Sequence, residues 1–317
     1  MDPQNNNLGL KYSAIAVFFW GMLPIALKLS GHFIDAISLT WFRFAFALVV
    51  IYFIQRMQGQ LGQFKLLNKN EWLRLGVAGL FLIGNYVTFV LSLKYLSPGE
   101  AQLNFQVAPF FLAFGGLLFF KERLSKVQLV CFFMLACGML MFFHPHLNLA
   151  SQQSSIWVGV ITIQISAFFW AGYALLQKSL LAKLSSNNIM LCLFAIGAIA
   201  LAPFTDFTPF IFMNGFEWAV ILFCAINTLV AYGCFGQAIK YWPTASVSAM
   251  VGLTPVLSFT FTELVVKLKL WPDTFSTNNL DALSIDGIGL IVLAVMSMQL
   301  VPLYLKRRKK LIMIASK

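Results

Sequence analysis

Two stretches of the chain decide its fold, because each is a copy of the other. Residues 71–109 read EWLRLGVAGLFLIGNYVTFVLSLKYLSPGEAQLNFQVAP, and residues 217–255 read EWAVILFCAINTLVAYGCFGQAIKYWPTASVSAMVGLTP. They align without a gap, and the motif FFW recurs in a similar way at 18–20 and 168–170. The sequence therefore predicts an internal duplication. The identical positions pair Glu71–Trp72 with Glu217–Trp218, Tyr86 with Tyr232, Phe89 with Phe235, Lys94–Tyr95 with Lys240–Tyr241, and Pro109 with Pro255.

The composition is that of a membrane protein. Of the 317 residues 60% are apolar and 10% are charged, with a mean hydropathy of +0.81, whereas a soluble domain carries roughly 25% charged residues. A helix of about 20 apolar residues crosses a bilayer, and about ten segments approach that length. They lie near residues 11–29, 37–55, 72–93, 99–120, 127–143, 157–177, 188–205, 217–239, 244–267 and 285–305.

The repeat and the charges set the topology. Each copy holds five segments, an odd number, so the second copy must enter the membrane from the opposite face. We therefore predict an all-α integral membrane protein with ten transmembrane helices, arranged as two inverted five-helix repeats at 1–147 and 148–317. Most of the 22 Lys and Arg residues, including the basic tail, fall on one side if the N-terminus is cytoplasmic. The positive-inside rule then places both termini in the cytoplasm.

Other classes of protein lack support in the sequence. The net charge of +11 follows from the basic loops, so we expect no nucleic-acid partner. The five cysteines all fall in apolar segments without a C-x-x-C pair, and His144 and His146 have no acidic or cysteine neighbour, so we expect no metal. No phosphate-binding loop or nucleophile–base motif is present, which indicates neither a cofactor nor an enzyme. The expected partners are a small-molecule substrate and the lipid bilayer.

Several motifs resemble the EamA-type branch of the drug/metabolite transporter superfamily. They are FFWG at 18–21, TWFRF at 40–44, SPGEAQLNFQVAPFFLAFGGLLFFKERLS at 97–125, FFWAGYALLQK at 168–178 and KYWPTASVSAMVGLTPVLSF at 240–259. The resemblance implies a ten-helix carrier of a bacterial inner membrane, for amino acids, other metabolites or drugs, often for export. The chain departs from the family pattern where Leu268 replaces the glutamate expected in the second copy, the counterpart of Glu122.

Polar residues on the fourth helix are candidates for a substrate site. Gln102, Gln106 and Pro109 share one helical face, and Ser248 is the counterpart of Gln102 in the second copy. Amide groups in hydrocarbon are costly unless they are satisfied. This face therefore either lines a wet cavity or forms interhelical hydrogen bonds.

Arg43 and a set of aromatic residues are the other candidates. A charge inside a membrane is a functional-site hypothesis by default. Arg43 either meets an anionic substrate or a buried acid, or it reaches the outer surface or backbone carbonyls. The aromatic residues occupy mid-span positions in both copies, where they either line the cavity or pack. They are Trp20, Tyr86, Trp170, Tyr173 and Tyr232.

Three more residues suggest roles in conformational change or coupling. Pro109 and Pro255 kink helices at matching depths, either as gating hinges or as ordinary membrane prolines. Glu263 either pairs with Lys267 one turn later or exchanges protons.

These features together predict a secondary transporter that moves a small polar metabolite, such as an amino acid or an amine, by alternating access. The alternatives are a nucleotide-sugar-type carrier and a non-transport membrane enzyme or lipid-handling scaffold. Convergence of the polar residues on one central cavity would favour the carrier over the enzyme or scaffold.

Overall fold

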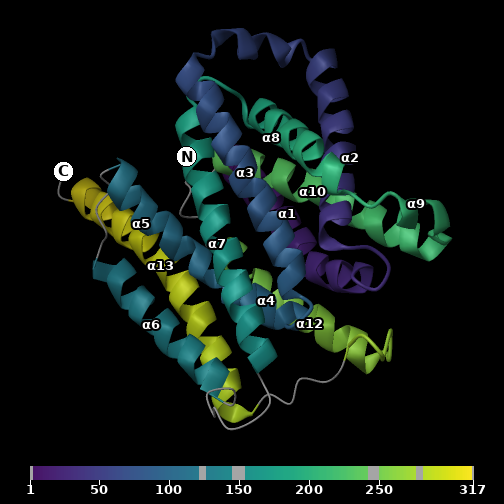
Figure 1. Ribbon diagram of the computed structural model, residues 1–317. Helices are drawn as coiled ribbons and strands as arrows, with labels where there is room; N and C mark the ends of the chain where they lie inside the picture. Colours follow the sequence, from purple (N-terminus) through teal and green to yellow (C-terminus); the bar gives the residue numbers. More distant parts are fainter. Residues whose placement is uncertain (1–2, 121–125, 145–153, 242–249, 276–280, 316–317) are drawn as a thin grey trace.

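The computed structural model describes residues 3–120, 126–144, 154–241, 250–275 and 281–315, and the regular structure in these ranges is all helical (Figure 1). The prediction of an all-α membrane protein is confirmed. The long helices are α1 (Pro3–Ser30), α2 (Ala36–Met57), α3 (Lys69–Ser92), α5 (Ala108–Phe120), α6 (Lys126–Phe143), α7 (Ser154–Leu180), α8 (Ser186–Leu201), α10 (Gly215–Tyr241), α12 (Thr254–Lys267) and α13 (Ala282–Ala315). The short elements are η1 (Gln60–Leu66), α4 (Pro98–Asn104), η2 (Phe105–Val107), η4 (Ala202–Phe204) and α9 (Thr208–Phe212).

Six described helices are long and apolar enough to cross a membrane, namely α1, α2, α3, α7, α8 and α10. The fourth predicted span is not continuous, because η2 separates α4 from α5. The break puts Pro109 in the first turn of α5, where a missing N–H costs no helical hydrogen bond. In the second copy Pro255 likewise lies in the first turn of α12, after a turn at 252–253. Both copies therefore restart a helix at the equivalent proline.

The start of α3 and the start of α10 share one capping motif. Asn68 Oδ1 accepts a hydrogen bond from the Glu71 amide at 3.0 Å, and Glu71 Oε2 accepts one from the Asn68 amide at 2.8 Å. Asn214 and Glu217 repeat both bonds at 3.0 and 2.8 Å. Such a capping box satisfies amides that a helix start leaves open. The glutamate recurs in both copies, as Glu71 and Glu217, because in each it completes this capping box.

Helices α2 and α8 show that the two copies are inverted. They are the second helices of their copies, and they run antiparallel. Ser38 lies beside Asp206 at one end of the pair, and Gln55 lies beside Asn188 at the other. Between these ends the rings of the equivalent residues Phe44 and Phe194 are in contact, with 5.2 Å between their centroids, as expected where a two-fold axis passes. Packing of α1 on α10 is likewise mirrored by packing of α3 on α7.

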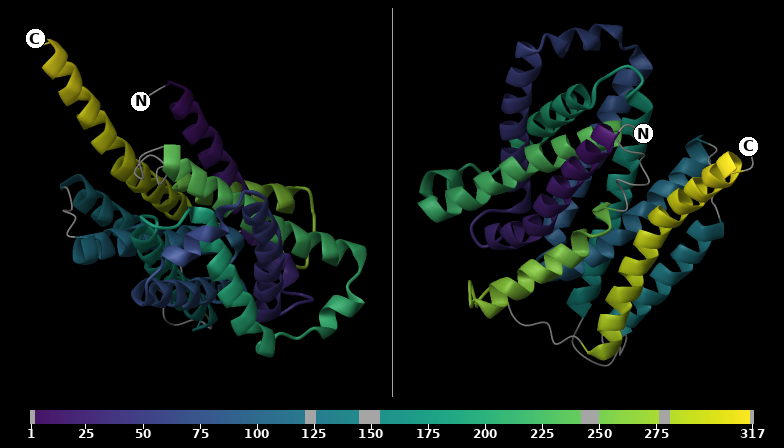
Figure 2. Two further views of the ribbon diagram at one scale, coloured as in Figure 1. Left: turned by 90° about the horizontal axis from the view of Figure 1, so that it is seen from above. Right: turned by 180° about the vertical axis from the view of Figure 1, so that it is seen from behind.

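The described helices divide into a main bundle and a smaller layer (Figure 2). Helices α6 and α13, the last of each copy, lie side by side in this layer. In the main bundle, buried apolar side chains form one cluster around α1, α3 and α10 and another around α2, α3, α7 and α8. Following the predicted cytoplasmic N-terminus, we call the side that holds the α1–α2 loop the outer side and the opposite side the inner side.

Glycines let α6 and α13 approach closely. A Cβ atom built on Gly287 would lie 2.7 Å from the Gly138 carbonyl oxygen and 2.7 Å from the Phe142 amide nitrogen. Backbone atoms cannot yield as a side chain can, so Gly287→Ala is expected to cost about 1–3 kcal/mol of stability by overpacking. Gly289→Ala is the control, because nothing lies within 4 Å of its Cβ position. The melting temperature in detergent should fall for the first variant only, and equal melting of both would contradict this packing.

A contact between a histidine and a carboxylate joins the outer ends of the same two helices. His144 Nε2 lies 2.9 Å from Asp281 Oδ2, and Asp281 Oδ1 accepts a hydrogen bond from the Ser284 amide at 2.9 Å. The bonds to Ser284 and the nearby imidazole lower the pKa of Asp281. Its contribution to stability is therefore present above the ordinary pKa of aspartate and is lost as the pH falls below it.

The variant Asp281→Asn should accordingly melt below the wild type at pH 7, and the difference should shrink as the pH is lowered toward 3. Melting curves across this range check the prediction. Asp273→Asn is the control, because no ion pair or hydrogen bond joins Asp273 to another described residue. A difference that grows at low pH would show that the charge of Asp281 does not stabilise the fold.

Candidate functional site

A cavity lies between the two copies near the middle of the main bundle. Its empty volume is about 750 Å³, including the part open to solvent. Helices α1, α2, α3, α7 and α10 contribute to it, as do α4, η2, the start of α5 and the start of α12 with the turn before it. The lining residues are Trp20, Leu23, Leu27, Arg43, Asn85, Tyr86, Phe89, Gln102, Phe105, Gln106, Ala108, Trp170, Tyr232, Val251 and Thr254.

Arg43 is the only basic residue in this described lining. Its side chain is 2% exposed, and its Nε donates a hydrogen bond to Thr228 Oγ1 at 3.0 Å. The guanidinium carbon lies 4.4 Å from the centre of the Tyr86 ring, a cation–π contact. Arg43 neither reaches the outer surface nor bonds to a backbone carbonyl of a described residue. Among the described residues no carboxylate lies within 4.0 Å of it, so its charge is not neutralised there.

The amide side chains also reach the cavity. Gln102 Nε2 donates to the Trp20 carbonyl at 3.1 Å, and Gln106 Nε2 donates to the Gln102 carbonyl at 3.4 Å. Gln102 therefore combines the two predicted roles, since it lines the cavity and bonds to α1, whereas Gln106 lines the cavity and bonds within its own segment. Asn85, which also lines the cavity, is held by hydrogen bonds from its Nδ2 to Ser166 Oγ at 2.9 Å and to the Ser166 carbonyl at 3.1 Å.

Aromatic rings form much of the wall. Tyr232 contacts Trp20 at 5.4 Å between centroids and Tyr86 at 5.9 Å. Trp170 contacts Phe105, with 6.0 Å between the ring centroids. Tyr173 does not line the cavity; it lies behind Tyr232 at 6.4 Å, is 1% exposed, and donates its hydroxyl to the sulfur of Met190 at 3.3 Å.

The remaining candidates lie elsewhere. Ser248 falls outside the described residues. Pro109 and Pro255 start helices beside the cavity, next to the lining residues Ala108 and Thr254. Glu263 does not line the cavity, and the predicted ion pair with Lys267 does not form within 4.0 Å.

Several lining residues were not predicted, although a comparison of equivalent positions in the two copies would have indicated some of them. Ala108 and Thr254 are equivalent positions of the two copies, as are Phe105 and Val251. Thr254 is 3% exposed and its hydroxyl has no hydrogen-bond partner among the described residues, so it is available to a ligand. Phe89 recurs as Phe235 in the second copy and could have been found in the same way, whereas Leu23 and Leu27 carried no signal, because apolar residues fill every span.

The symmetry of the cavity is broken by its polar groups. Trp20 and Trp170 both line it, as do Tyr86 and Tyr232. Arg43, however, corresponds to Leu193, which is 0% exposed and apolar. The first copy also supplies Asn85, Gln102 and Gln106, whereas the described lining from the second copy has the hydroxyls of Tyr232 and Thr254 and the indole of Trp170 as its polar groups.

Comparisons with known proteins agree with this architecture. The EamA-like transporter family matches residues 7–144 and, separately, residues 157–299. The uncharacterized inner membrane transporter YhbE of Escherichia coli K12 is 31% identical over 295 residues, covering 92% of this chain and 91% of YhbE. An uncharacterized transporter of Haemophilus influenzae is 29% identical over 286 residues, covering 90% of this chain and 92% of that protein.

A solved crystal structure shares the fold, with a TM-score of 0.65 at 18% identity, and covers 95% of this chain and 99% of its own. The family matches both halves of the chain, and YhbE is similar over nearly the whole length. The chain therefore belongs to the EamA-like transporter family of the drug/metabolite transporter superfamily, and is a multi-pass membrane transporter, not an enzyme.

Proposed function

We propose that this transporter is a secondary carrier for a small polar metabolite that bears a carboxylate, with amino acids as the nearest class. Arg43 is the observation that carries the proposal. It presents a charge without a described counter-ion in a cavity between the two repeats, where carriers built from inverted repeats bind their substrates. A carboxylate accepts two hydrogen bonds from a guanidinium and neutralises it.

The rest of the cavity suits the remainder of such a molecule. Indole and phenol rings around the guanidinium offer apolar surface, and their faces attract an ammonium group. Gln102 and Gln106 have side-chain oxygens that accept no hydrogen bond from a described residue, so they are open to a donor. A nucleotide-sugar carrier would have to neutralise two phosphates, and the described lining offers Arg43 alone for that.

Transport by alternating access follows from the inverted repeats. Two copies of one bundle in opposite orientations have two related arrangements, one open to each side, around a fixed midplane site. The protein would sit in a bacterial inner membrane, as the name of YhbE says of that relative. The basic residues favour cytoplasmic termini, with the repeats divided near residues 147 and 148.

A ligand panel tests the proposal. Purified protein is screened by thermal shift against the standard L-amino acids, the amines that lack their carboxylates and the acids that lack their amino groups. A ligand at 100 times its Kd stabilises a protein by about 2.7 kcal/mol, so binding is detectable. We expect stabilisation by carboxylate-bearing compounds and counterflow of the same compounds in proteoliposomes. Stabilisation by amines alone, or no flux of any stabilising compound, would overturn it.

A further inference from the structure

A second hollow opens on the outer side of the molecule, apart from the central cavity. Its empty volume is about 1140 Å³, including the part open to solvent. The outer ends of α1, α2 and α3, the segment before α9 and the first turn of α9 line it. We call it the outer vestibule, and its lining residues are Leu27, Lys28, Gly31, His32, Phe33, Ile34, Asp35, Ala36, Val90, Leu93, Lys94, Asp206 and Pro209.

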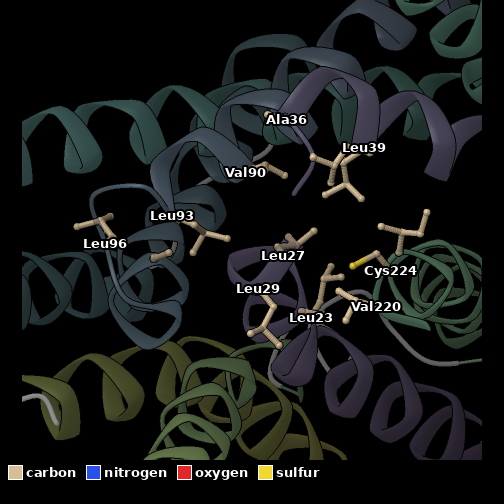
Figure 3. Close-up of a cluster of buried hydrophobic side chains, with 14 of the residues drawn as sticks. Leu23, Leu27, Leu29, Ala36, Leu39, Val90, Leu93, Leu96, Val220 and Cys224 are labelled. Atoms are coloured by element: carbon tan, nitrogen blue, oxygen red, sulfur yellow. The ribbon is translucent and has the colours of Figure 1, made fainter. Parts of the chain in front are cut away.

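Leu27 is the only described residue that lines both hollows. It is 2% exposed and belongs to the apolar cluster around α1, α3 and α10. Figure 3 shows its side chain in the middle of this cluster, between Val90 and Leu93 on one side and Leu23 and Val220 on the other. Leu27 and its apolar neighbours therefore separate the vestibule from the central cavity.

The vestibule carries charges of both signs that do not neutralise each other. Lys94 is exposed and forms no ion pair or hydrogen bond with any residue that the structure describes. Asp35 Oδ1 accepts the amides of Ile37 at 2.8 Å and Ser38 at 3.0 Å at the start of α2, which leaves its Oδ2 without a described partner. Lys94 and Asp35 do not approach within 4.0 Å of each other, so both remain open to a ligand.

The neighbouring lysine has a structural role instead. Lys28 Nζ donates hydrogen bonds to the Leu96 carbonyl at 2.9 Å and to the Leu93 carbonyl at 3.3 Å. These carbonyls lie just past the end of α3, where a cation is favourable. Lys28 thus fixes the α3–α4 connection, which forms one wall of the vestibule, and its amine is already occupied.

We infer that the outer vestibule is a second binding site for a zwitterionic metabolite, with Lys94 facing its carboxylate, Asp35 facing its ammonium group and Leu27 gating its passage to the central cavity. The inference rests on the proposed function, because a transport path is what joins an outer hollow to a central one. It adds a site that the central cavity does not require.

Thiol labelling tests this site without measuring transport. Leu27→Cys is introduced into a chain whose five cysteines are replaced, with Ala36→Cys as a second reporter should the first variant fold poorly. Impermeant methanethiosulfonates, one anionic and one cationic, are added to the outer side of sealed vesicles. Removing one charge at about 7 Å changes the local concentration of a charged reagent about two- to threefold at low salt.

We expect both reagents to label the reporter. Lys94→Gln should slow the anionic reagent two- to threefold and Asp35→Asn, which keeps the helix cap, should slow the cationic one. Lys269→Gln is the control, because Lys269 is an outer lysine that does not line the vestibule. No labelling from the outer side, or equal effects of Lys94→Gln and Lys269→Gln, would overturn the inference.

A competition experiment separates this site from the central one. A mixture of the standard L-amino acids should slow labelling, and Lys94→Gln or Asp35→Asn should remove the protection while Arg43→Gln leaves it in place. Protection lost only in Arg43→Gln would mean that the ligand binds in the central cavity alone. The proposed function would then stand and the vestibular site would not.

Discussion

Replacing Asn188 by alanine is expected to open the inner side of the transporter and to lower its stability by about 2–4 kcal/mol, because it leaves buried polar groups unpaired. Asn188 is 0% exposed, and its side chain joins the first copy to the second. Its Oδ1 accepts a hydrogen bond from Gln55 Nε2 at 2.8 Å. Its Nδ2 donates to the Gln60 carbonyl at 2.8 Å and to Gln63 Oε1 at 2.9 Å.

The equivalent position on the outer side is held less firmly. Ser38 is the counterpart of Asn188, and its Oγ accepts a single hydrogen bond from the Asp206 amide at 2.9 Å. On the inner side the pair Lys183–Glu71, at 2.7 Å, adds a further link between the copies. Opening to the inside must break these bonds, so they favour the conformation that is closed there.

Two measurements check the Asn188→Ala prediction. The melting temperature should fall, and Cys192, one turn along α8 and partly buried, should react faster with a thiol reagent when it is the only cysteine left. Asn187→Ala is the matched control, because Asn187 makes one long bond of 3.5 Å to Gln55, and its loss should stay within about 0.5 kcal/mol. If both variants melt alike, the amide of Asn188 does not lock the inner side.

Arg43→Gln is expected to weaken binding of a carboxylate ligand about 10- to 100-fold, since hydrogen bonds to a charged group contribute about 1.5–3 kcal/mol. Glutamine can still bond to Thr228, so the fold should survive. The thermal shift produced by the ligand found in the panel measures the loss of affinity. Flux at saturating ligand then separates an effect on binding from an effect on the transport step. The unliganded protein should melt near the wild type.

Arg74→Gln is the control for the lost positive charge, because Arg74 is exposed on α3 and does not line the cavity. Arg43→Lys adds a finer test, since lysine keeps the charge but lacks the planar fork. It should bind with intermediate strength. Unchanged ligand affinity in Arg43→Gln would contradict the assignment of the carboxylate to this residue.

The repeat in the sequence was enough to predict the fold and much of the cavity. Aromatic residues that recur at equivalent positions, such as Trp20 and Trp170, were predicted together and line the cavity together. Arg43 stood out because charges are rare inside spans. The signal was strong wherever a residue type was unusual for its surroundings.

The side-chain hydrogen bonds between helices had no comparable signal in the sequence. Gln55, Gln63 and Asn188 lie near span ends, where polar residues are ordinary, and their mutual bonds depend on the packing of α2 against α8. Tyr173 was predicted for the cavity because it is aromatic and mid-span, but its ring turns toward Met190. The side of a helix that faces a cavity is set by tertiary packing, which periodicity in a uniformly apolar segment does not reveal.

The unequal copies have a mechanical consequence. If Arg43 binds the carboxylate, then a bound solute stays attached to the first copy during the conformational change. The second copy has Leu193 at the matching position, so it moves relative to the solute without an ionic contact to it. The solute would then move with the first copy, and the free energy for its release would have to come from hydration of the Arg43 guanidinium.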